Sequence, residues 1–213
     1  MSETHVSHPI FARFWTLVSP SMDRGGAAEY RRRLLAGLSG RVLEVGAGNG
    51  LNFAHYPTEV THVLAVEPES HLRQAGRENA ARAQVAVDVV PGVADHLPAE
   101  DASVDAVVCS LVLCSVPDQA GALREAARVL RPGGQLRFFE HVRADTSGLA
   151  RAQRLLDSTI WPALGGGCHT ARDTAAAIAA AGFVTEHLER VRFPDTRVPL
   201  PTSPHIIGAA RRG

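Results

Sequence analysis

The sequence contains no lysine. All 22 of its basic residues are arginines, and 22 acidic residues balance them, so the net charge at pH 7 is zero. A chain without excess positive charge lacks the basic surface that nucleic acid requires, so we expect no nucleic-acid partner. No apolar run approaches the ~18 residues that suggest a transmembrane helix. The start of the chain, residues 1–15, lacks the basic and apolar regions of a secretory signal.

Cysteines are scarce as well. The three, Cys109, Cys114 and Cys168, are an odd number without metal-ligand spacing, so we interpret them as reduced thiols and predict a cytoplasmic protein with no metal. The 213 residues, 45% of them hydrophobic, suffice for one α/β domain with a sizeable core. We see neither an internal repeat nor a second domain, and we expect a monomer.

One stretch, residues 41–52, organises the rest of the chain. Its first residues form a short apolar run that is typical of a buried parallel strand. Gly46, Gly48 and Gly50 follow as a turn whose backbone a ligand can approach closely. Glu67 stands at the end of the next apolar run, where a carboxylate can accept both hydroxyls of a ribose. The glycines alone would also fit a tight turn without a ligand, but this order of elements favours a nucleoside site.

Glu44 indicates which nucleoside cofactor fits. This carboxylate lies inside the first strand, where its burial is costly unless a cationic or donating group faces it. It would repel a pyrophosphate, whereas a cofactor with an amino group and a sulfonium would be compatible with it.

With Glu67-Pro68 after the second strand, the motif E-V-G-A-G-N-G resembles that of class I S-adenosylmethionine (SAM)-dependent methyltransferases. The resemblance covers residues 41–213 and includes the Arg-Pro-Gly-Gly turn at residues 131–134. It implies a Rossmann-like, doubly wound α/β sheet of seven strands in the order 3-2-1-4-5-7-6, with the last pair antiparallel. It also implies SAM as cofactor and S-adenosylhomocysteine as product. The acid that the family commonly carries in the adenine loop, at position 93, is here either displaced to Asp95 or absent. We expect cofactor contacts from Glu44, Gly46, Ala47, Gly48, Asn49, Gly50, Asn52, Glu67, Pro68, Gly92, Val93, Ala94, Ser110 and Leu111.

Residues 1–40 precede this domain, which we place at residues 41–213. Phe11, Phe14 and Trp15 recur at helical spacing, and Ser19-Pro20 is expected to interrupt their helix. This aromatic stripe fits a lid over the cofactor, a helix that simply docks on the sheet, or a segment that touches a membrane.

Longer sequence motifs indicate the chemical class of the methyl acceptor. C-S-L-V-L-C-S-V at 109–116, E-H-V at 140–142, Gly167-Cys168 with Thr170-Ala171-Arg172, and the tail at 203–208 resemble the small methyltransferase-like family whose animal members methylate alkyl thiols. The resemblance implies S-methylation of a small molecule. His141, at the end of the strand predicted over residues 135–142, is our candidate base or thiolate partner. We expect acceptor contacts from Phe11, Phe14, Trp15, Cys114, Trp161, His169 and Arg172.

Other interpretations stay open at this point. His141 could instead shape the pocket or bond the backbone. The chain could methylate a phospholipid or another amine, or a natural-product hydroxyl, or bind SAM without catalysis. The sequence leaves open the acceptor's identity, the need for a general base and the motion of the lid.

Overall fold

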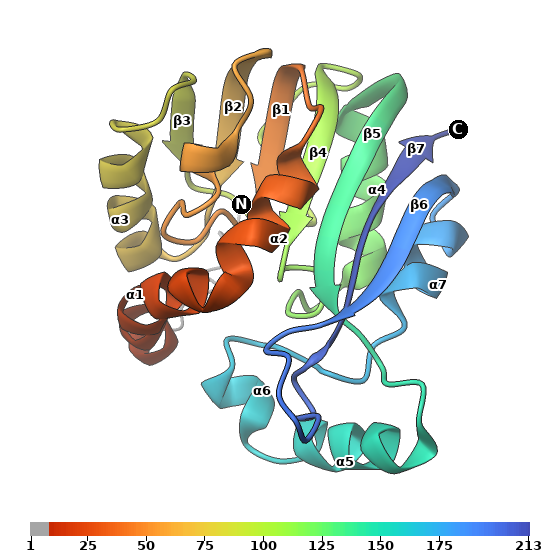
Figure 1. The fold of residues 1–213 in the computed structure, drawn as a ribbon. Helices are drawn as coiled ribbons and strands as arrows, with labels where there is room; N and C mark the ends of the chain where they lie inside the picture. Colours follow the sequence, from red (N-terminus) through yellow and green to blue (C-terminus); the bar gives the residue numbers. More distant parts are fainter. Residues whose placement is uncertain (1–8) are drawn as a thin grey trace.

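Seven strands form one sheet in the order β3-β2-β1-β4-β5-β7-β6, which confirms the predicted topology (Figure 1). The computed structural model describes residues 9–213, so the first part of the segment considered above as a signal, residues 1–8, lies outside the described residues. The strands β1 to β5 run parallel, while β7 is antiparallel to both β5 and β6. The strands are β1 (Gly40–Val45), β2 (Val60–Val66), β3 (Val87–Val90), β4 (Val104–Ser110), β5 (Leu130–His141), β6 (Phe183–Arg192) and β7 (Pro204–Arg212).

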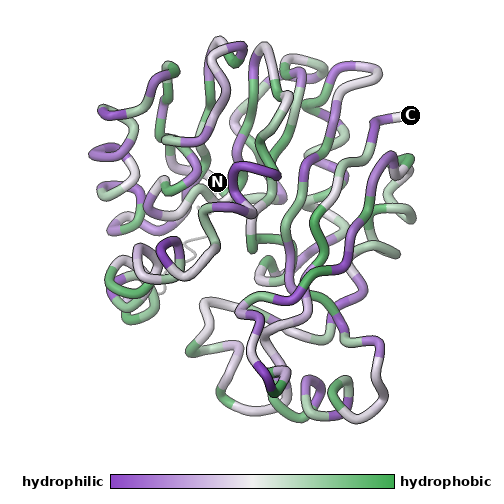
Figure 2. The backbone as a smooth tube through the Cα atoms, viewed as in Figure 1, coloured by the Kyte–Doolittle hydropathy of each residue, from purple (hydrophilic) through white to green (hydrophobic). Residues whose placement is uncertain are grey.

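Helices cover both faces of the sheet (Figure 1). On one face α4 and α7 pack against a core that includes Leu123 and Ile178, and on the other α2 contributes Leu34 and Leu35. Hydrophobic stretches follow the strands in Figure 2, and hydrophilic residues gather on α2 and α3. The helices are α1 (Pro9–Met22), α2 (Ala28–Leu35), α3 (Ser70–Ala80), α4 (Gln119–Val129), α5 (Ser147–Asp157), α6 (Trp161–Leu164) and α7 (Thr174–Ala180), with a π-turn η1 (Asp23–Ala27) and a 3-10 turn η2 (Phe53–His55).

The carboxyl ends of the central strands lie level with one another. Val45 pairs with Val66 on one side and with Cys109 on the other. These ends point toward the lower edge of the sheet in Figure 1, and α1, α5 and α6 lie below that edge. In open α/β sheets ligands bind at this edge, so the sheet places the predicted site between its strand ends and these helices.

Two local predictions near this edge are wrong. Pro20 does not interrupt the first helix, because α1 continues to Met22, and the backbone breaks instead at Gly26, whose φ is +116°. Thr170 and Asp173 have the spacing of a capping box, which predicts Thr170 as the helix cap. Thr170 does not cap α7, because the Asp173 carboxylate itself accepts from the Ala176 N–H at 3.2 Å. Thr170 is bonded elsewhere, to Asp157.

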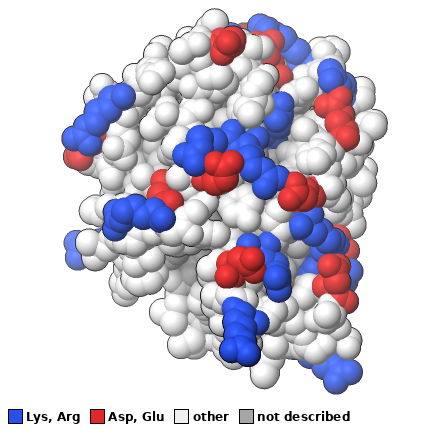
Figure 3. Space-filling view, in the orientation of Figure 1, with Lys and Arg blue, Asp and Glu red and all other residues white. Residues whose placement is uncertain are grey.

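Residues 9–40 form two helices with different neighbours. Helix α2 is part of the domain's core, whereas α1 packs on α3 and extends over the strand ends. None of the helices between residues 9 and 213 is both long enough and apolar enough to cross a membrane. On the face drawn in Figure 3, basic and acidic side chains are interspersed. Arg31, for example, pairs with Asp23 at 2.8 Å, and Arg33 pairs with Glu189.

Candidate active site

The predicted glycine turn follows β1 directly. Gly46, Gly48 and Gly50 have φ values of +60°, +57° and +77°, which side chains rarely adopt. A Cβ atom on Gly46 would lie 2.6 Å from a methyl of Val112, whereas one on Gly48 would meet only Trp15 Nε1, at 3.7 Å. The turn is therefore packed against the segment after β4 on one side. At Gly48 it faces α1 with space between them.

Glu44 lies beneath this turn and is 2% exposed. Its carboxylate accepts from Asn52 Nδ2 and from the Tyr56 hydroxyl, both at 2.7 Å. Burial raises the pKa of Glu44 to about 7, against the hydrogen bonds and the nearby Arg31, which lower it. The donors that the buried carboxylate requires are thus supplied by the chain itself, and Glu44 supports the turn from below. A direct contact with the cofactor stays a prediction.

Glu67 connects the end of β2 to the same turn. One carboxylate oxygen accepts from the Gly48 N–H at 2.8 Å and the other from the Glu69 N–H at 2.9 Å. Burial raises the pKa of Glu67, although both backbone bonds oppose this. Each carboxylate oxygen has a second lone pair, so Glu67 can still accept from a ribose at the position that the sequence predicted.

The predicted adenine loop is a tight turn after β3. Val93 pairs with His96, and a Cβ on Gly92 would lie 2.8 Å from a methyl of Val66. Gly92, Val93 and Ala94 therefore lie at the strand edge beside Glu67. The Glu67 N–H also donates to the Val90 carbonyl at 3.0 Å, which holds the ends of β2 and β3 together.

The end of β4 carries two signs of a binding site. Within residues 9–213, the buried side-chain polar atoms without a hydrogen-bond partner are Ser110 Oγ and Trp161 Nε1. Buried polar atoms are rarely left unpaired, and both belong to residues predicted here to contact cofactor or acceptor. Leu111 has φ +61°, a strained conformation that clusters at functional sites. The unpaired Ser110 hydroxyl and the open approach to Gly48 fit SAM as the cofactor.

Helix α1 covers the glycine turn. Asn49 Nδ2 donates to Ser19 Oγ at 3.0 Å, which fixes the helix to the turn. Trp15 faces Gly48, Phe11 stacks on Trp15 with ring centroids 5.6 Å apart, and a Cβ on Gly166 would lie 2.7 Å from the Phe11 ring. Phe14, in contrast, is 57% exposed, and its contact with the acceptor stays a prediction. Phe11 and Trp15 therefore bridge the glycine turn and the loop after α6.

Three segments bring Cys114, His141 and Cys168 together. The sulfur of Cys114 lies 3.6 Å from His141 Nδ1, that of Cys168 lies 3.5 Å from the same nitrogen, and the two sulfurs are 3.9 Å apart. The Cys114 thiol, with His141, lowers the pKa of Cys168 to about 5, whereas hydrogen bonding to Cys168 and burial raise the pKa of Cys114. The rings of His205 and His141 lie against each other, with centroids 4.2 Å apart and planes tilted by 38°, and burial lowers the pKa of His205 to about 3.

Buried polar side chains hold these three segments in place. The Glu140 carboxylate accepts from the backbone N–H groups of Val112 (3.0 Å) and Cys114 (3.1 Å). Arg172 donates to the carbonyls of Leu113 and Val116, both at 2.7 Å, on the other side of the same turn. Arg172 thus positions the turn that carries Cys114, a role that the sequence did not predict; its predicted contact with the acceptor stays a prediction.

The segment with Cys168 is fixed just as firmly. The His169 N–H donates to the Cys114 carbonyl at 2.8 Å, which joins the two cysteine segments directly. The Gln153 amide, 0% exposed, donates to three carbonyls, including those of Val142 and Thr170, and accepts from the Ala144 N–H. The sequence did not predict a role in the site for Cys168, Glu140 or Gln153, because their partners lie far away along the chain.

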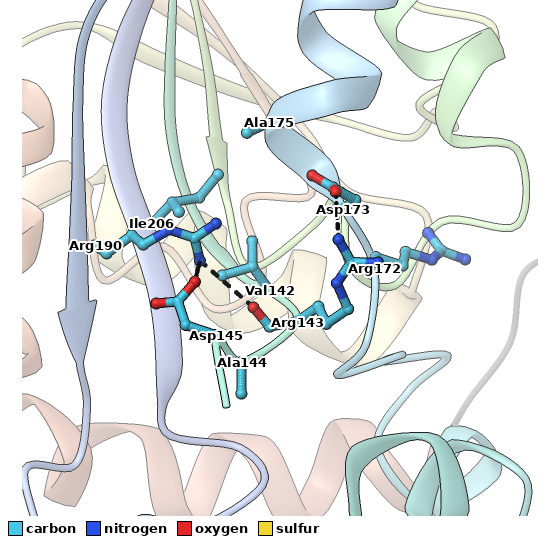
Figure 4. Close-up of a pocket in the computed structure, with 9 residues that line it drawn as sticks. All are labelled: Val142, Arg143, Ala144, Asp145, Arg172, Asp173, Ala175, Arg190 and Ile206. Carbon is cyan, nitrogen blue, oxygen red and sulfur yellow. Dashed lines mark hydrogen bonds and ion pairs between the residues drawn. The ribbon is translucent and has the colours of Figure 1, made fainter. Parts of the chain in front are cut away.

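A separate hollow lies beyond the end of β5 (Figure 4). Its charged side chains are paired with one another, Arg143 with Asp173 at 2.9 Å and Arg190 with Asp145 at 3.2 Å. Arg172 borders the hollow, but its guanidinium points away from it in Figure 4. The residues that line this hollow include none from the glycine turn and neither cysteine of the cluster.

Comparisons with known proteins agree with this site. The family described as "Methyltransferase domain" matches residues 43–138, which include Glu44, the glycine turn and Glu67. A SAM-dependent methyltransferase from Thermotoga maritima superposes with a TM-score of 0.69 at 21% identity, covering 97% of this chain and 99% of that one. A geranyl diphosphate methyltransferase in complex with SAM gives 0.67 at 16% identity, over 89% and 85%. Fold, glycine turn and family match define a SAM-dependent methyltransferase, which confirms the predicted enzyme class and cofactor.

A closer relative identifies the family. The human thiol S-methyltransferase TMT1B is 38% identical over 182 residues, covering 83% of this chain and 73% of that protein. The chain belongs to the family of this methyltransferase.

Proposed function

We propose that the protein transfers the methyl group of SAM to the sulfur of a small-molecule thiol. The observation that carries this proposal is the convergence of Cys114, His141 and Cys168 at the ligand edge of the sheet, next to the residues that follow β4. Sulfur and imidazole groups suit a sulfur acceptor better than a charged amine. The name and 38% identity of human thiol S-methyltransferase TMT1B support the same acceptor class.

The chain's own residues would hold the two reactants. The cofactor's nucleoside end approaches the glycine turn at Gly48 and bonds to the Glu67 carboxylate. Ser110 and Leu111 lie beside it, and Gly92, Val93 and Ala94 contact its adenine. Trp15 and Phe11, on α1, cover the cofactor and border the acceptor, so we propose α1 as the lid. Trp161 and His169 complete the acceptor side.

When bound, SAM supplies a methyl group on a sulfonium, a good leaving group for in-line displacement. The acceptor thiol loses its proton, its sulfur forms a bond to the methyl carbon, and the sulfonium bond to that carbon breaks to leave S-adenosylhomocysteine. Placing the sulfur within about 3–3.5 Å of the methyl accounts for most of the acceleration. A thiol with a pKa of about 8.5 needs only modest help to ionise, and we propose that His141 favours the thiolate.

We further propose that the enzyme works as a monomer in the cytoplasm. The three free, buried cysteines support a reducing compartment.

The test is turnover with labelled SAM against an alkyl thiol, an aryl thiol, a catechol and an ethanolamine lipid. We expect methylation of the thiols and at least a tenfold lower rate with the other two. Preferential methylation of the catechol or the lipid would refute the thiol assignment while leaving the cofactor site intact. Leu17, 78% exposed on α1, offers a control: Leu17→Ala should behave as the parent, whereas His141→Ala should lower turnover more than SAM affinity.

A further inference from the structure

The three groups that converge at the end of β5 are all ligands that zinc prefers. Cys114, His141 and Cys168 each direct one ligand atom to a common point, and these atoms lie within 4.8 Å of one another. The separations along the chain are 27 residues on either side of His141, so no local motif signals the cluster. Catalytic zinc sites with two cysteines and one histidine leave a fourth position for substrate.

The distances agree with a tetrahedral ion. Zinc lies about 2.3 Å from sulfur and about 2.0–2.1 Å from imidazole nitrogen. At the tetrahedral angle, these bond lengths put two sulfurs about 3.8 Å apart and a sulfur and a nitrogen about 3.5–3.6 Å apart. The observed separations are 3.9 Å between the sulfurs and 3.6 and 3.5 Å from them to His141 Nδ1.

The surrounding structure keeps the three ligands in this geometry. Glu140 and Arg172 fix the turn of Cys114 from opposite sides, Gln153 ties the end of β5 to the segment that follows Cys168, and the His169 N–H joins the two cysteine segments. Outer hydrogen bonds of this kind orient the ligands of metal sites. Cys109, on the same strand as Ser110, is equally buried but shares none of these contacts.

We propose that Cys114, His141 and Cys168 bind one Zn²⁺ ion, whose fourth position receives the acceptor thiol as a thiolate. This rests on the proposed function, and it states how His141 would favour the thiolate: as a metal ligand through Nδ1 rather than as a free base. The acceptor's S–H proton passes to solvent on binding. The thiolate sulfur then forms its bond to the methyl carbon, and the product thioether, a weaker ligand, leaves.

The site lies where such an ion could act on the reaction. Cys114 follows Val112 by two residues, and Val112 packs against Gly46 of the glycine turn. Cys168 follows Gly166 by two residues, and Gly166 lies against Phe11, which stacks on Trp15 of α1. The segments that carry the two cysteines therefore pack against the glycine turn and against α1, on either side of the proposed cofactor and acceptor space.

The first test is metal binding by the full chain, kept reduced with a phosphine. We expect one Zn²⁺ per chain, and with Co²⁺ the sulfur-to-metal charge-transfer band and the visible bands of a tetrahedral ion. Loss of an outer-shell partner already weakens metal sites 10–100-fold, so Cys114→Ser and Cys168→Ser should each weaken Zn²⁺ binding by more than about 100-fold. Cys109→Ser is the matched control and should bind Zn²⁺ within about twofold of the parent. SAM binding by each variant checks that it is folded.

The second test separates this proposal from the proposed function. Adding an alkyl thiol to the Co²⁺-loaded protein should strengthen the charge-transfer band, and chelator-stripped protein should lose thiol methylation and regain it with Zn²⁺. Absence of stoichiometric metal, or equal binding by Cys168→Ser, would overturn the site. Full thiol methylation by stripped protein would overturn the metal's role and leave the proposed function standing. Tight binding through the three residues without methylation of any thiol would support the site and refute the thiol acceptor.

Discussion

A substitution at Gly48 tests most directly whether the glycine turn binds a ligand or is only a tight turn. Its φ is +57°, and a methyl group there would meet no protein atom closer than Trp15 Nε1 at 3.7 Å. Gly37 is a matched control, because its φ is +73° and a methyl group there would meet nothing within 4 Å. Alanine in this left-handed conformation costs about 1–2 kcal/mol at either position.

Both variants, Gly48→Ala and Gly37→Ala, should therefore lose similar stability. For a chain of this size, each kcal/mol lowers the melting temperature by about 2–4 °C, so both should melt roughly 2–8 °C below the parent. Only the Gly48 methyl enters the space between the turn and α1. We expect it to weaken SAM binding at least tenfold, which corresponds to about 1.4 kcal/mol.

Thermal unfolding without ligand and calorimetric titration with SAM measure the two effects. Gly37→Ala should bind SAM within about twofold of the parent. If Gly48→Ala binds SAM as Gly37→Ala does, the cofactor does not approach the turn at this residue, and the turn is only structural.

Three further predictions concern the supports of the site. The pKa of Glu44 is about 7 in the folded protein and 4.5 ordinarily. Between these pH values the native state binds a proton that the unfolded state has lost. The free energy of unfolding should therefore fall as the pH rises from about 4.5 to about 7. In the Glu44→Gln variant this decrease should be smaller by roughly 3 kcal/mol. Denaturant titrations across this pH range measure it, and the same pH dependence in parent and variant would contradict a raised pKa for Glu44. Gln153→Leu should lower the free energy of unfolding by about 2–4 kcal/mol, because it leaves buried partners unpaired, whereas a loss under 1 kcal/mol in urea would show that the partners re-pair. Trp15→Ala should raise the KM for SAM several-fold while Leu17→Ala leaves it unchanged; equal KM values would exclude α1 as a lid.

Local patterns in the sequence predicted most of the fold. The apolar runs at β1, β2 and β4, the glycine turn and the Arg-Pro-Gly-Gly turn are short-range signals, and the resemblance ordered them into the observed sheet. Pro20 was misleading because a helix can continue through a proline, whereas Gly26, with its left-handed φ, does break the backbone.

The acceptor side of the site depends on contacts that no local pattern contains. Cys114 and Cys168 are 54 residues apart and meet because Glu140, Gln153 and Arg172 bind backbone groups of distant segments. Considered by spacing alone, the cysteines gave no metal signal. Glu44 illustrates the same limit, because its predicted need for donors was correct but Asn52 and Tyr56 supply them.

The most direct test of the account is a single competition experiment with SAM that carries a trideuterated methyl group. The enzyme is given equal amounts of an alkyl thiol and of the alcohol with the same carbon chain, and the products are identified by mass spectrometry. The account predicts the label in the thioether alone, with one S-adenosylhomocysteine formed for each thioether. Label in the ether, or consumption of SAM without either product, would contradict it.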